Sequence, residues 1–219
     1  MTLILGIDDA GRGPVLGPMI LAGVLAKSED EKEISEFGAK DSKLLSPNQR
    51  AQIKEKLSKF KSHIEISEPK EIDSSDNLNY LEAKKAAKII NVLTKNIDEK
   101  ITVIIDCPST NIQSWQNDVF QLLDDKEKIN LSCEHKADFN HPIVSAASIL
   151  AKEKREELML KIRKEFQVDL GSGYPADPKT KEFIAENFDN EKFNSIIRFS
   201  WNTVKKLIKA KEAGQKKLF

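Results

Sequence analysis

The sequence predicts an α/β protein whose C-terminal part is helical. Short apolar runs of strand length alternate with helical patterns up to about residue 133, and only helical patterns follow. This order is typical of an α/β core with appended helices. The 219 residues suffice for one sizeable core and a small appendage. We therefore expect a core over residues 1–170 and a helical part over 171–219 packed on it, ending in a mobile basic tail.

Five segments are expected to be strands, because they are short and either apolar or alternating: residues 3–7, 19–26, 63–66, 101–105 and 128–133. Five others are expected to be helices: residues 46–59, 76–95, 144–166, 179–188 and 202–212. The first helix begins with Ser46 as cap and Pro47 at its first position, a favoured start. The second has one apolar stripe at three- and four-residue steps.

The composition is that of a globular chain with a charge-rich surface, with 39% hydrophobic and 32% charged residues. Its apolar runs are too short to span a bilayer, and no basic leader precedes the first strand. Cys107 and Cys133 match neither a zinc motif nor a disulfide framework. We expect a cytoplasmic protein that does not bind a membrane. With no heptad repeat in the sequence, we also expect a monomer.

The formal net charge is zero, but the charge is segregated along the chain. Residues 196–219 hold seven basic side chains against the single acid Glu212, whereas residues 28–36 are acidic. Phosphate binding depends on local basic clusters rather than on the total charge. The pattern permits a nucleic-acid partner, and the alternative is a lysine-rich helix that only faces solvent.

Asp8, Asp9 and Asp106 are expected at the C-terminal ends of apolar strands, and a fourth acid, Asp138, follows another strand-like run. In α/β folds the ends of the strands form the edge where ligands bind. Carboxylates gathered there repel one another unless a cation lies among them. Carboxylate oxygens suit Mg²⁺ and Mn²⁺, and a pair of such ions is a standard device for phosphodiester displacement. The four acids therefore predict a metal-dependent phosphodiesterase, although each alone could cap a turn or form an Asx-turn.

A segment rich in glycine and proline, residues 11–18 (GRGPVLGP), follows the first two acids. Leu16 stands where a dinucleotide-binding fingerprint needs glycine, and no Walker motif follows. Its small residues around Arg12 would let backbone amides approach a sugar-phosphate chain. The alternative is a tight turn with a structural arginine.

Eight blocks of the sequence carry a resemblance to a known family, in this order: residues 6–18 (GIDDAGRGPVLGP), 41–43 (DSK), 77–79 (NLN), 105–108 (IDCP), 134–138 (EHKAD), 144–152 (VSAASILAK), 171–180 (GSGYPADPKT) and 198–203 (RFSWNT). In this order they resemble type 2 ribonuclease H, or ribonuclease HII, in its single-chain archaeal form. The resemblance extends over roughly nine-tenths of the chain.

The resemblance implies a ribonuclease H-like fold, with a mixed sheet of about five strands flanked by helices and a helical C-terminal part. It implies an endonuclease that cuts RNA in RNA/DNA hybrids, and cuts on the 5′ side of a ribonucleotide embedded in duplex DNA, with two metal ions, Mg²⁺ or Mn²⁺. The products would carry 3′-hydroxyl and 5′-phosphate ends. The catalytic and metal-binding acids of the family fall on four positions: Asp8, Asp9, Asp106 and Asp138.

The substrate-sensing loop of the family falls on Gly11, Arg12 and Gly13, which are expected to contact the ribose 2′-hydroxyl and the adjacent phosphates. The junction-sensing tyrosine falls on Tyr174, which would stack on the following deoxyribose; alternatively its ring only docks on the core. By charge and neighbourhood, four lysines are candidate phosphate contacts: Lys43, Lys136, Lys152 and Lys181.

His135 and His141 flank Asp138. A mobile histidine there could assist proton transfer or product release, although we expect His135 to hydrogen-bond within its own loop. One departure from the family concerns position 9, where the family has glutamate and this chain has Asp9. The shorter side chain loses about 1.5 Å of reach. We expect retained activity with a changed metal preference, towards the larger Mn²⁺.

Two other classes of protein remain as alternatives. The first is a nucleic-acid-binding protein of the same fold without catalysis, for which Asp9 is the supporting feature, while the other three acids oppose it. The second is another two-metal phosphotransferase, such as a recombinase or resolvase, which the loop at Arg12 and Tyr174 oppose. The last five residues (QKKLF) resemble part of a sliding-clamp-binding peptide, and the alternative is a plain basic tail.

Overall fold

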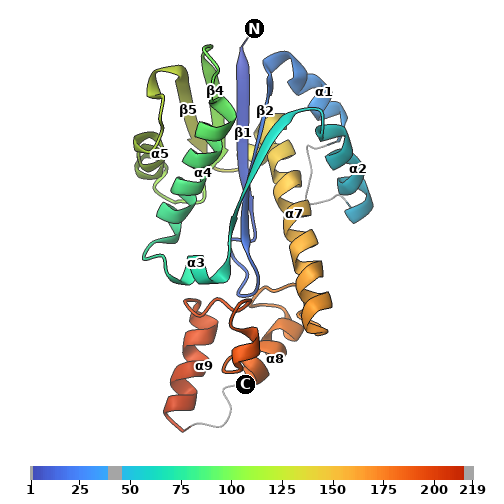
Figure 1. Cartoon of the computed structure of the whole chain (residues 1–219), viewed down its shortest axis with the longest axis vertical. Coiled ribbons are helices and arrows are strands. Elements are labelled where there is room, and N and C mark those ends of the chain that lie inside the picture. The colour runs from blue at the N-terminus through green and yellow to red at the C-terminus, as the bar shows by residue number, and fades with distance from the viewer. Residues whose placement is uncertain (1, 39–45, 215–219) are drawn as a thin grey trace. The chain divides into compact units, whose positions relative to one another are not determined.

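The computed structural model describes residues 2–38 and 46–214 of the chain. Five strands form one sheet: β1 (Leu3–Ala10), β2 (Met19–Lys27), β3 (Lys61–Ser67), β4 (Ile101–Asp106) and β5 (Ile129–Glu134). Their order in the sheet is β3-β2-β1-β4-β5 (Figure 1). Strand β1 runs antiparallel to β2 and parallel to β4, which is parallel to β5. The predicted mixed five-stranded sheet is confirmed.

Nine α-helices lie in the described part of the chain: α1 (Glu31–Glu36), α2 (Pro47–Leu57), α3 (Pro69–Asp73), α4 (Leu78–Thr94), α5 (Ile112–Gln121), α6 (Ala137–Asn140), α7 (Pro142–Phe166), α8 (Pro178–Asn187) and α9 (Asn202–Glu212). All five predicted helices are present. The capping box at Ser46, with Gln49 three residues later, begins α2 as its sequence indicates. Helices α1, α3 and α6 were not predicted, because they have six residues or fewer, and the ten-residue α5 was also not predicted.

Helices cover both faces of the sheet, and two glycines allow them to approach closely (Figure 1). A Cβ atom on Gly6 of β1 would lie 2.5 Å from the Ile143 backbone, at the start of α7. On the other face, a Cβ atom on Gly23 of β2 would lie 2.3 Å from the Ile89 side chain of α4. Burial on both faces explains why β1 and β2 read as continuous apolar runs.

Strand β1 continues past its apolar run into the two acids, which confirms the prediction that the C-terminal end of this strand carries Asp8 and Asp9. The antiparallel ladder with β2 continues to the pairs formed by Asp8 with Ala22 and Asp9 with Leu21. The parallel ladder with β4 ends at Ile7. The two acids therefore lie inside a strand, just beyond the point where the parallel pairing stops.

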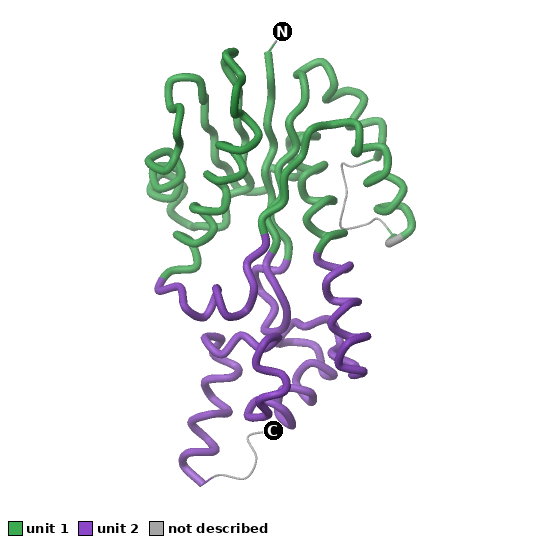
Figure 2. Tube along the Cα trace, in the orientation of Figure 1, with its two compact units in different colours: residues 1–10, 20–65, 77–154 green, residues 11–19, 66–76, 155–219 purple. Residues whose placement is uncertain are grey.

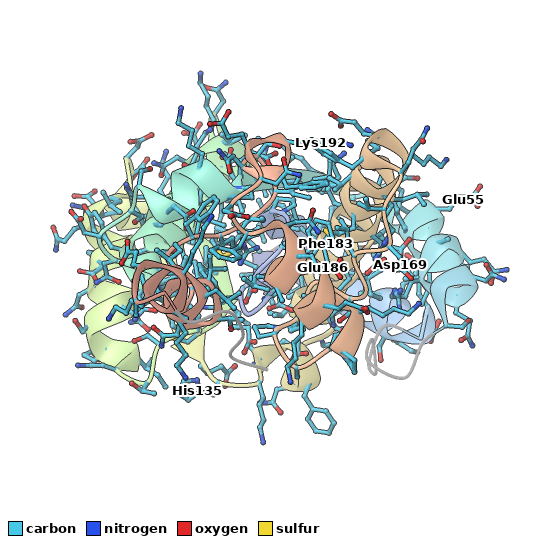
Figure 3. The ribbon with its side chains drawn as sticks, turned by 90° about the horizontal axis from the view of Figure 1, so that it is seen from below. Glu55, His135, Asp169, Phe183, Glu186 and Lys192 are labelled. Atoms are coloured by element: carbon cyan, nitrogen blue, oxygen red, sulfur yellow. The ribbon has the colours of Figure 1, made fainter. Side chains whose placement is uncertain are left out.

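The chain divides into two compact units (Figure 2). Unit 1 comprises residues 1–10, 20–65 and 77–154, and unit 2 comprises residues 11–19, 66–76 and 155–219. Unit 2 has its own apolar core, which contains Phe183 (labelled in Figure 3). The Phe183 ring packs edge-on against Phe193 at 4.9 Å between centroids. The expected domain division at residue 170 stays a prediction. No helix in the described residues is both long and apolar enough to cross a membrane.

Candidate active site

Three of the four predicted acids line one small cavity in unit 1. Asp8 and Asp9 come from β1 and Asp106 from the end of β4. The parallel pairing of β1 with β4 brings their C-terminal ends to the same edge of the sheet. Trp115 of α5 also lines the cavity, and its indole nitrogen donates a hydrogen bond of 2.8 Å to the Asn79 carbonyl. This bond ties α5 to α4 beside the acids.

Asp8 is the buried member of the group, with 5% of its surface exposed. Burial raises the pKa of its carboxyl well above the ordinary value, and the neighbouring Asp9 and Asp106 raise it further. The Asp9 amide donates a hydrogen bond of 2.7 Å to Asp8 Oδ1. The cavity therefore concentrates negative charge that a cation would stabilise.

Asp106 connects the cavity to the segment that carries Asp138. The Ala137 amide, at the first residue of α6, donates a hydrogen bond of 3.0 Å to Asp106 Oδ1. Lys136 precedes it with a left-handed backbone, φ 60°, which turns the chain from β5 into this short helix. Asp138 is the second residue of α6 and is half-buried. One backbone hydrogen bond thus holds the start of α6 against Asp106.

The donor chemistry of these acids fits a hard divalent cation such as Mg²⁺ or Mn²⁺. A buried carboxyl destabilised by two neighbouring acids is the feature of this structure that such an ion would relieve. In the described residues, however, no three His, Cys, Asp or Glu side chains converge closely enough to form a ready metal site. Asp8, Asp9 and Asp106 share a cavity, and Asp138 adjoins it through α6.

A fifth acid, Glu82 of α4, lines the same cavity and was missed in the sequence. It is only 1% exposed. The signal was present, because Glu82 lies four residues before Ala86 on the apolar stripe of its helix. A charged side chain on a buried helical face is rare unless it has a partner or a function.

The predicted substrate loop lies in unit 2, where Gly11 needs to be glycine. Its φ is +84°, and a Cβ atom there would lie 2.4 Å from Nε of the buried Arg155. A Cβ atom on Gly13 would lie 3.5 Å from the Tyr174 ring, so the loop and this tyrosine are neighbours. Tyr174 is 45% exposed, and its ring lies 5.7 Å from the Arg155 guanidinium carbon.

The remaining predicted residues are four lysines and two histidines. Lys136 and Lys181 are exposed and Lys152 is half-buried, while Lys43 lies outside the described residues. His135 is exposed (Figure 3), and its Nδ1 donates a hydrogen bond of 3.1 Å to the Cys107 carbonyl. The expected bond within its own loop is therefore replaced by one to the end of β4. His141 pairs with Glu134.

Asp177 orders the segment around Tyr174 and leads to a prediction about pH. Its carboxylate accepts hydrogen bonds from the amides of Ser172 at 2.7 Å and Lys179 at 2.9 Å, the second at the start of α8. Hydrogen bonds from the Ser172 side chain and from the Ser172 amide lower the pKa of Asp177 from 3.8 to about 2, and the side-chain bond has the larger effect. A carboxyl whose pKa is lower in the folded than in the unfolded protein stabilises the fold at a pH above its ordinary pKa. This stabilisation is lost as the pH falls through the pKa of the folded protein.

We therefore expect Asp177→Asn to flatten the fall of melting temperature between pH 3.8 and about 2. The asparagine oxygen can keep the hydrogen bond from the Lys179 amide, so α8 keeps its cap, whereas the bond from the Ser172 amide is lost. Thermal unfolding followed by circular dichroism across this range tests it. Asp124→Asn, at an exposed side chain, controls for the loss of one charge. Parallel curves for wild type and Asp177→Asn would contradict the expectation.

Solved structures define the fold class of this protein. The ribonuclease H2 from Pyrococcus horikoshii OT3 aligns with a TM-score of 0.85 at 33% identity, covering 94% of this chain and 97% of that one. The PCNA:RNase HII complex from Archaeoglobus fulgidus contains a chain that aligns with a TM-score of 0.80 at 30% identity, covering 91% of this chain and 95% of that one. Bst-RNase HIII in complex with Mn²⁺ aligns at 0.78 and 21% identity, covering 98% and 70%, and shows the fold alone. The chain is thus an α/β protein of the ribonuclease H-like class.

The sequence comparisons narrow this class to one family. Ribonuclease HII from Methanocaldococcus jannaschii is 38% identical over 219 aligned residues, covering 94% of this chain and 95% of the relative. The family model for ribonuclease HII matches residues 5–204. The chain belongs to the ribonuclease HII family, and its activity is that of a ribonuclease H, an endonuclease hydrolase.

Proposed function

We propose that this ribonuclease hydrolyses RNA in RNA/DNA hybrids and cuts on the 5′ side of single ribonucleotides embedded in duplex DNA. The products carry 3′-hydroxyl and 5′-phosphate ends. The observation that carries this proposal is the buried Asp8 sharing a cavity with Asp9 and Asp106 at the C-terminal end of β1 and β4. Such a concentration of carboxylates suits metal-assisted attack of water on a phosphodiester.

The four aspartates would hold two ions of Mg²⁺ or Mn²⁺, with Asp8 and Asp106 as the central ligands. When bound, such ions lower the pKa of the attacking water and neutralise charge on the leaving oxygen. The Ala137 amide orients the Asp106 carboxylate through its 3.0 Å hydrogen bond. Glu82 adds a further buried carboxyl to the wall of the cavity. Its role would be to orient water or ligands from behind, as outer groups commonly do at metal sites.

Substrate choice would depend on the loop Gly11-Arg12-Gly13 and on Tyr174. Amides of the loop and the Arg12 side chain would contact the ribose 2′-hydroxyl and the adjacent phosphates, and the 2′-hydroxyl is the group that separates RNA from DNA. The exposed Tyr174 ring, next to Gly13, would stack on the deoxyribose that follows. Four lysines would add phosphate contacts: Lys43, Lys136, Lys152 and Lys181.

The position of the cut tests the proposal most directly. A DNA duplex with one ribonucleotide is labelled at either end, incubated with Mg²⁺ or Mn²⁺, and its products are sized at nucleotide resolution. We expect a single cut immediately 5′ of the ribonucleotide and no cut in the all-DNA duplex. A cut at another position, a cut of the all-DNA duplex, or no product with either metal would refute the proposal.

Asp9 supports a second expectation, which concerns metal preference. Its side chain is one methylene shorter than the glutamate of the family, so its carboxylate loses about 1.5 Å of reach towards a metal. We expect the rate with Mn²⁺, relative to Mg²⁺, to fall severalfold in Asp9→Glu, because the longer side chain restores a site suited to the smaller ion. Rates are compared over a titration of each metal. Identical metal profiles for the two proteins would contradict this expectation.

A sliding clamp is the proposed protein partner. The homologue from Archaeoglobus fulgidus was solved as a PCNA:RNase HII complex. The residues of this chain that resemble a clamp-binding peptide, 215–219, lie outside the described part of the structure. Deletion of these five residues is expected to abolish retention of the enzyme on immobilised clamp while leaving cleavage unchanged. Equal retention of both proteins would refute the proposal.

A further inference from the structure

Arg198 is a buried arginine whose guanidinium group binds the backbone of the predicted substrate loop. It has no exposed surface. Its three nitrogens donate hydrogen bonds to the carbonyls of Gly11 at 2.7 Å, Arg12 at 3.0 Å and Gly17 at 2.8 Å. Arg198 and Gly11 both lie in unit 2, although they are 187 positions apart in the sequence. One side chain therefore binds two consecutive peptide groups of the loop and also the carbonyl of Gly17, a few residues further along the chain.

Trp201 extends the same support to the next residue of the loop. Its indole nitrogen donates a hydrogen bond of 3.0 Å to the Gly13 carbonyl. Its ring lies 4.8 Å from the Arg198 guanidinium carbon, a cation–π distance. The carbonyls of residues 11, 12 and 13 are thus all occupied by two neighbouring side chains.

The segment that carries these two side chains is itself fixed. The Arg198 amide donates to the Val15 carbonyl at 2.9 Å. The Asp73 carboxylate, at the end of α3, accepts hydrogen bonds from the amides of Phe199 at 2.7 Å and Ser200 at 2.9 Å. Because the segment that carries Arg198 and Trp201 is itself anchored, the loop is held in one conformation before the substrate binds. The entropy of ordering the loop is then not lost on binding, which is the benefit of preorganisation.

The direction of these bonds determines where the loop presents its donors. In a trans peptide group the carbonyl and the amide point in opposite directions. With the carbonyls of Gly11 and Arg12 turned towards Arg198, the amides of Arg12 and Gly13 are turned away from it. Two successive amides that point the same way form a concavity for anions and for hydroxyl oxygen. The buried positive charge of Arg198 behind them adds to this polarity.

We infer that Arg198 and Trp201 are positioning residues for ribose recognition, acting through the backbone of Gly11, Arg12 and Gly13. The inference rests on the proposed function of that loop. It assigns a task to two residues of the block over 198–203, which neither the acids nor the loop explains. The two side chains do not touch the substrate, and they set which backbone amides face it.

The experiment measures ribose discrimination rather than activity alone. Dissociation constants are measured by fluorescence anisotropy for two DNA duplexes of identical sequence, one with a single ribonucleotide, in Ca²⁺ to prevent cleavage. The first variant is Arg198→Lys, which keeps the charge but cannot reach three carbonyls. The second is Trp201→Phe, which keeps an aromatic ring but removes the indole N–H that donates to Gly13. Arg50→Lys is the matched control, because Arg50 bonds Glu153 in unit 1.

We expect Arg198→Lys to weaken binding of the ribonucleotide duplex about tenfold and Trp201→Phe a fewfold, in line with the loss of hydrogen bonds that hold the loop. Binding of the all-DNA duplex should weaken less, because it has no 2′-hydroxyl contact to lose and the phosphate contacts outside the loop remain. The ratio of the two dissociation constants should therefore fall. KM for the ribonucleotide substrate should rise more than kcat falls. A purely structural defect would instead lower the active fraction and leave the ratio of the two dissociation constants as in the wild type.

Three outcomes separate the possibilities. If the wild type does not distinguish the two duplexes, the proposed function fails, and this inference fails with it. If the wild type distinguishes them and both folded variants keep its ratio, only the inference is overturned. If Arg198→Lys does not fold, as judged by circular dichroism, Trp201→Phe decides: an unchanged ratio overturns the inference, and a reduced ratio supports it.

Discussion

Asp106→Asn is expected to abolish cleavage while leaving the fold intact. The asparagine oxygen can still accept the 3.0 Å hydrogen bond from the Ala137 amide, so α6 keeps its anchor on β4. What is lost is the negative charge in the cavity that Asp106 shares with Asp8 and Asp9. Metal ions contribute several kcal/mol to such a reaction, and each 1.4 kcal/mol is a factor of ten, so we expect a loss of roughly a thousandfold or more.

Single-turnover rates on the ribonucleotide duplex measure this loss, and the melting temperature checks the fold. Asp124→Asn provides the matched control, because it is the same change at an exposed side chain. Cleavage by Asp106→Asn within tenfold of the wild type would show that these acids do not hold the catalytic metal. The same result would leave the family and the fold untouched, since neither depends on the charge.

Gly6→Ala is expected to cause the largest loss of stability among single-methyl additions at the sheet. The new Cβ would lie 2.5 Å from the carbonyl carbon and oxygen of Ile143 and 2.6 Å from the Val144 nitrogen. These are backbone atoms, so no side-chain rotation relieves the contact and the start of α7 has to move. Overpacking of this kind costs about 1–3 kcal/mol. For a chain of this size each kcal/mol lowers the melting temperature by about 2–4 °C.

Gly23→Ala is the informative comparison, because its Cβ would meet the Ile89 and Leu93 side chains of α4. The helical Ile89 has little rotamer freedom, but the contact is with side chains and not with the backbone, so α4 can relieve it with a smaller shift and the cost should be smaller. Differential scanning calorimetry of both variants gives the two melting temperatures. A drop for Gly23→Ala equal to that for Gly6→Ala would show that backbone contact is not the deciding factor.

Much of the sheet could be predicted from local patterns. Buried strands such as β4 are short β-branched runs, and α4 has a regular apolar stripe, so period and length identify them. The end of β1 was predicted as well, because its apolar run leads directly into Asp8 and Asp9. Its extension to Ala10 was not predicted, because Ala10 belongs to the strand through its pairing with Ile20 of β2, and cross-strand pairing leaves no mark on the local pattern.

The sequence predicted that the acids at the ends of β1 and β4 lie close together, because each follows directly on an apolar strand and the ends of such strands share one edge of the sheet. The sequence by itself therefore determined the family, the sheet and the three acids Asp8, Asp9 and Asp106 as one group. Only the tertiary structure brought Glu82 into their cavity and placed Arg198 behind Gly11. The physical reason is distance along the chain: periodicity reports which face of an element is buried, whereas a contact between residues far apart in sequence is decided by how the elements pack.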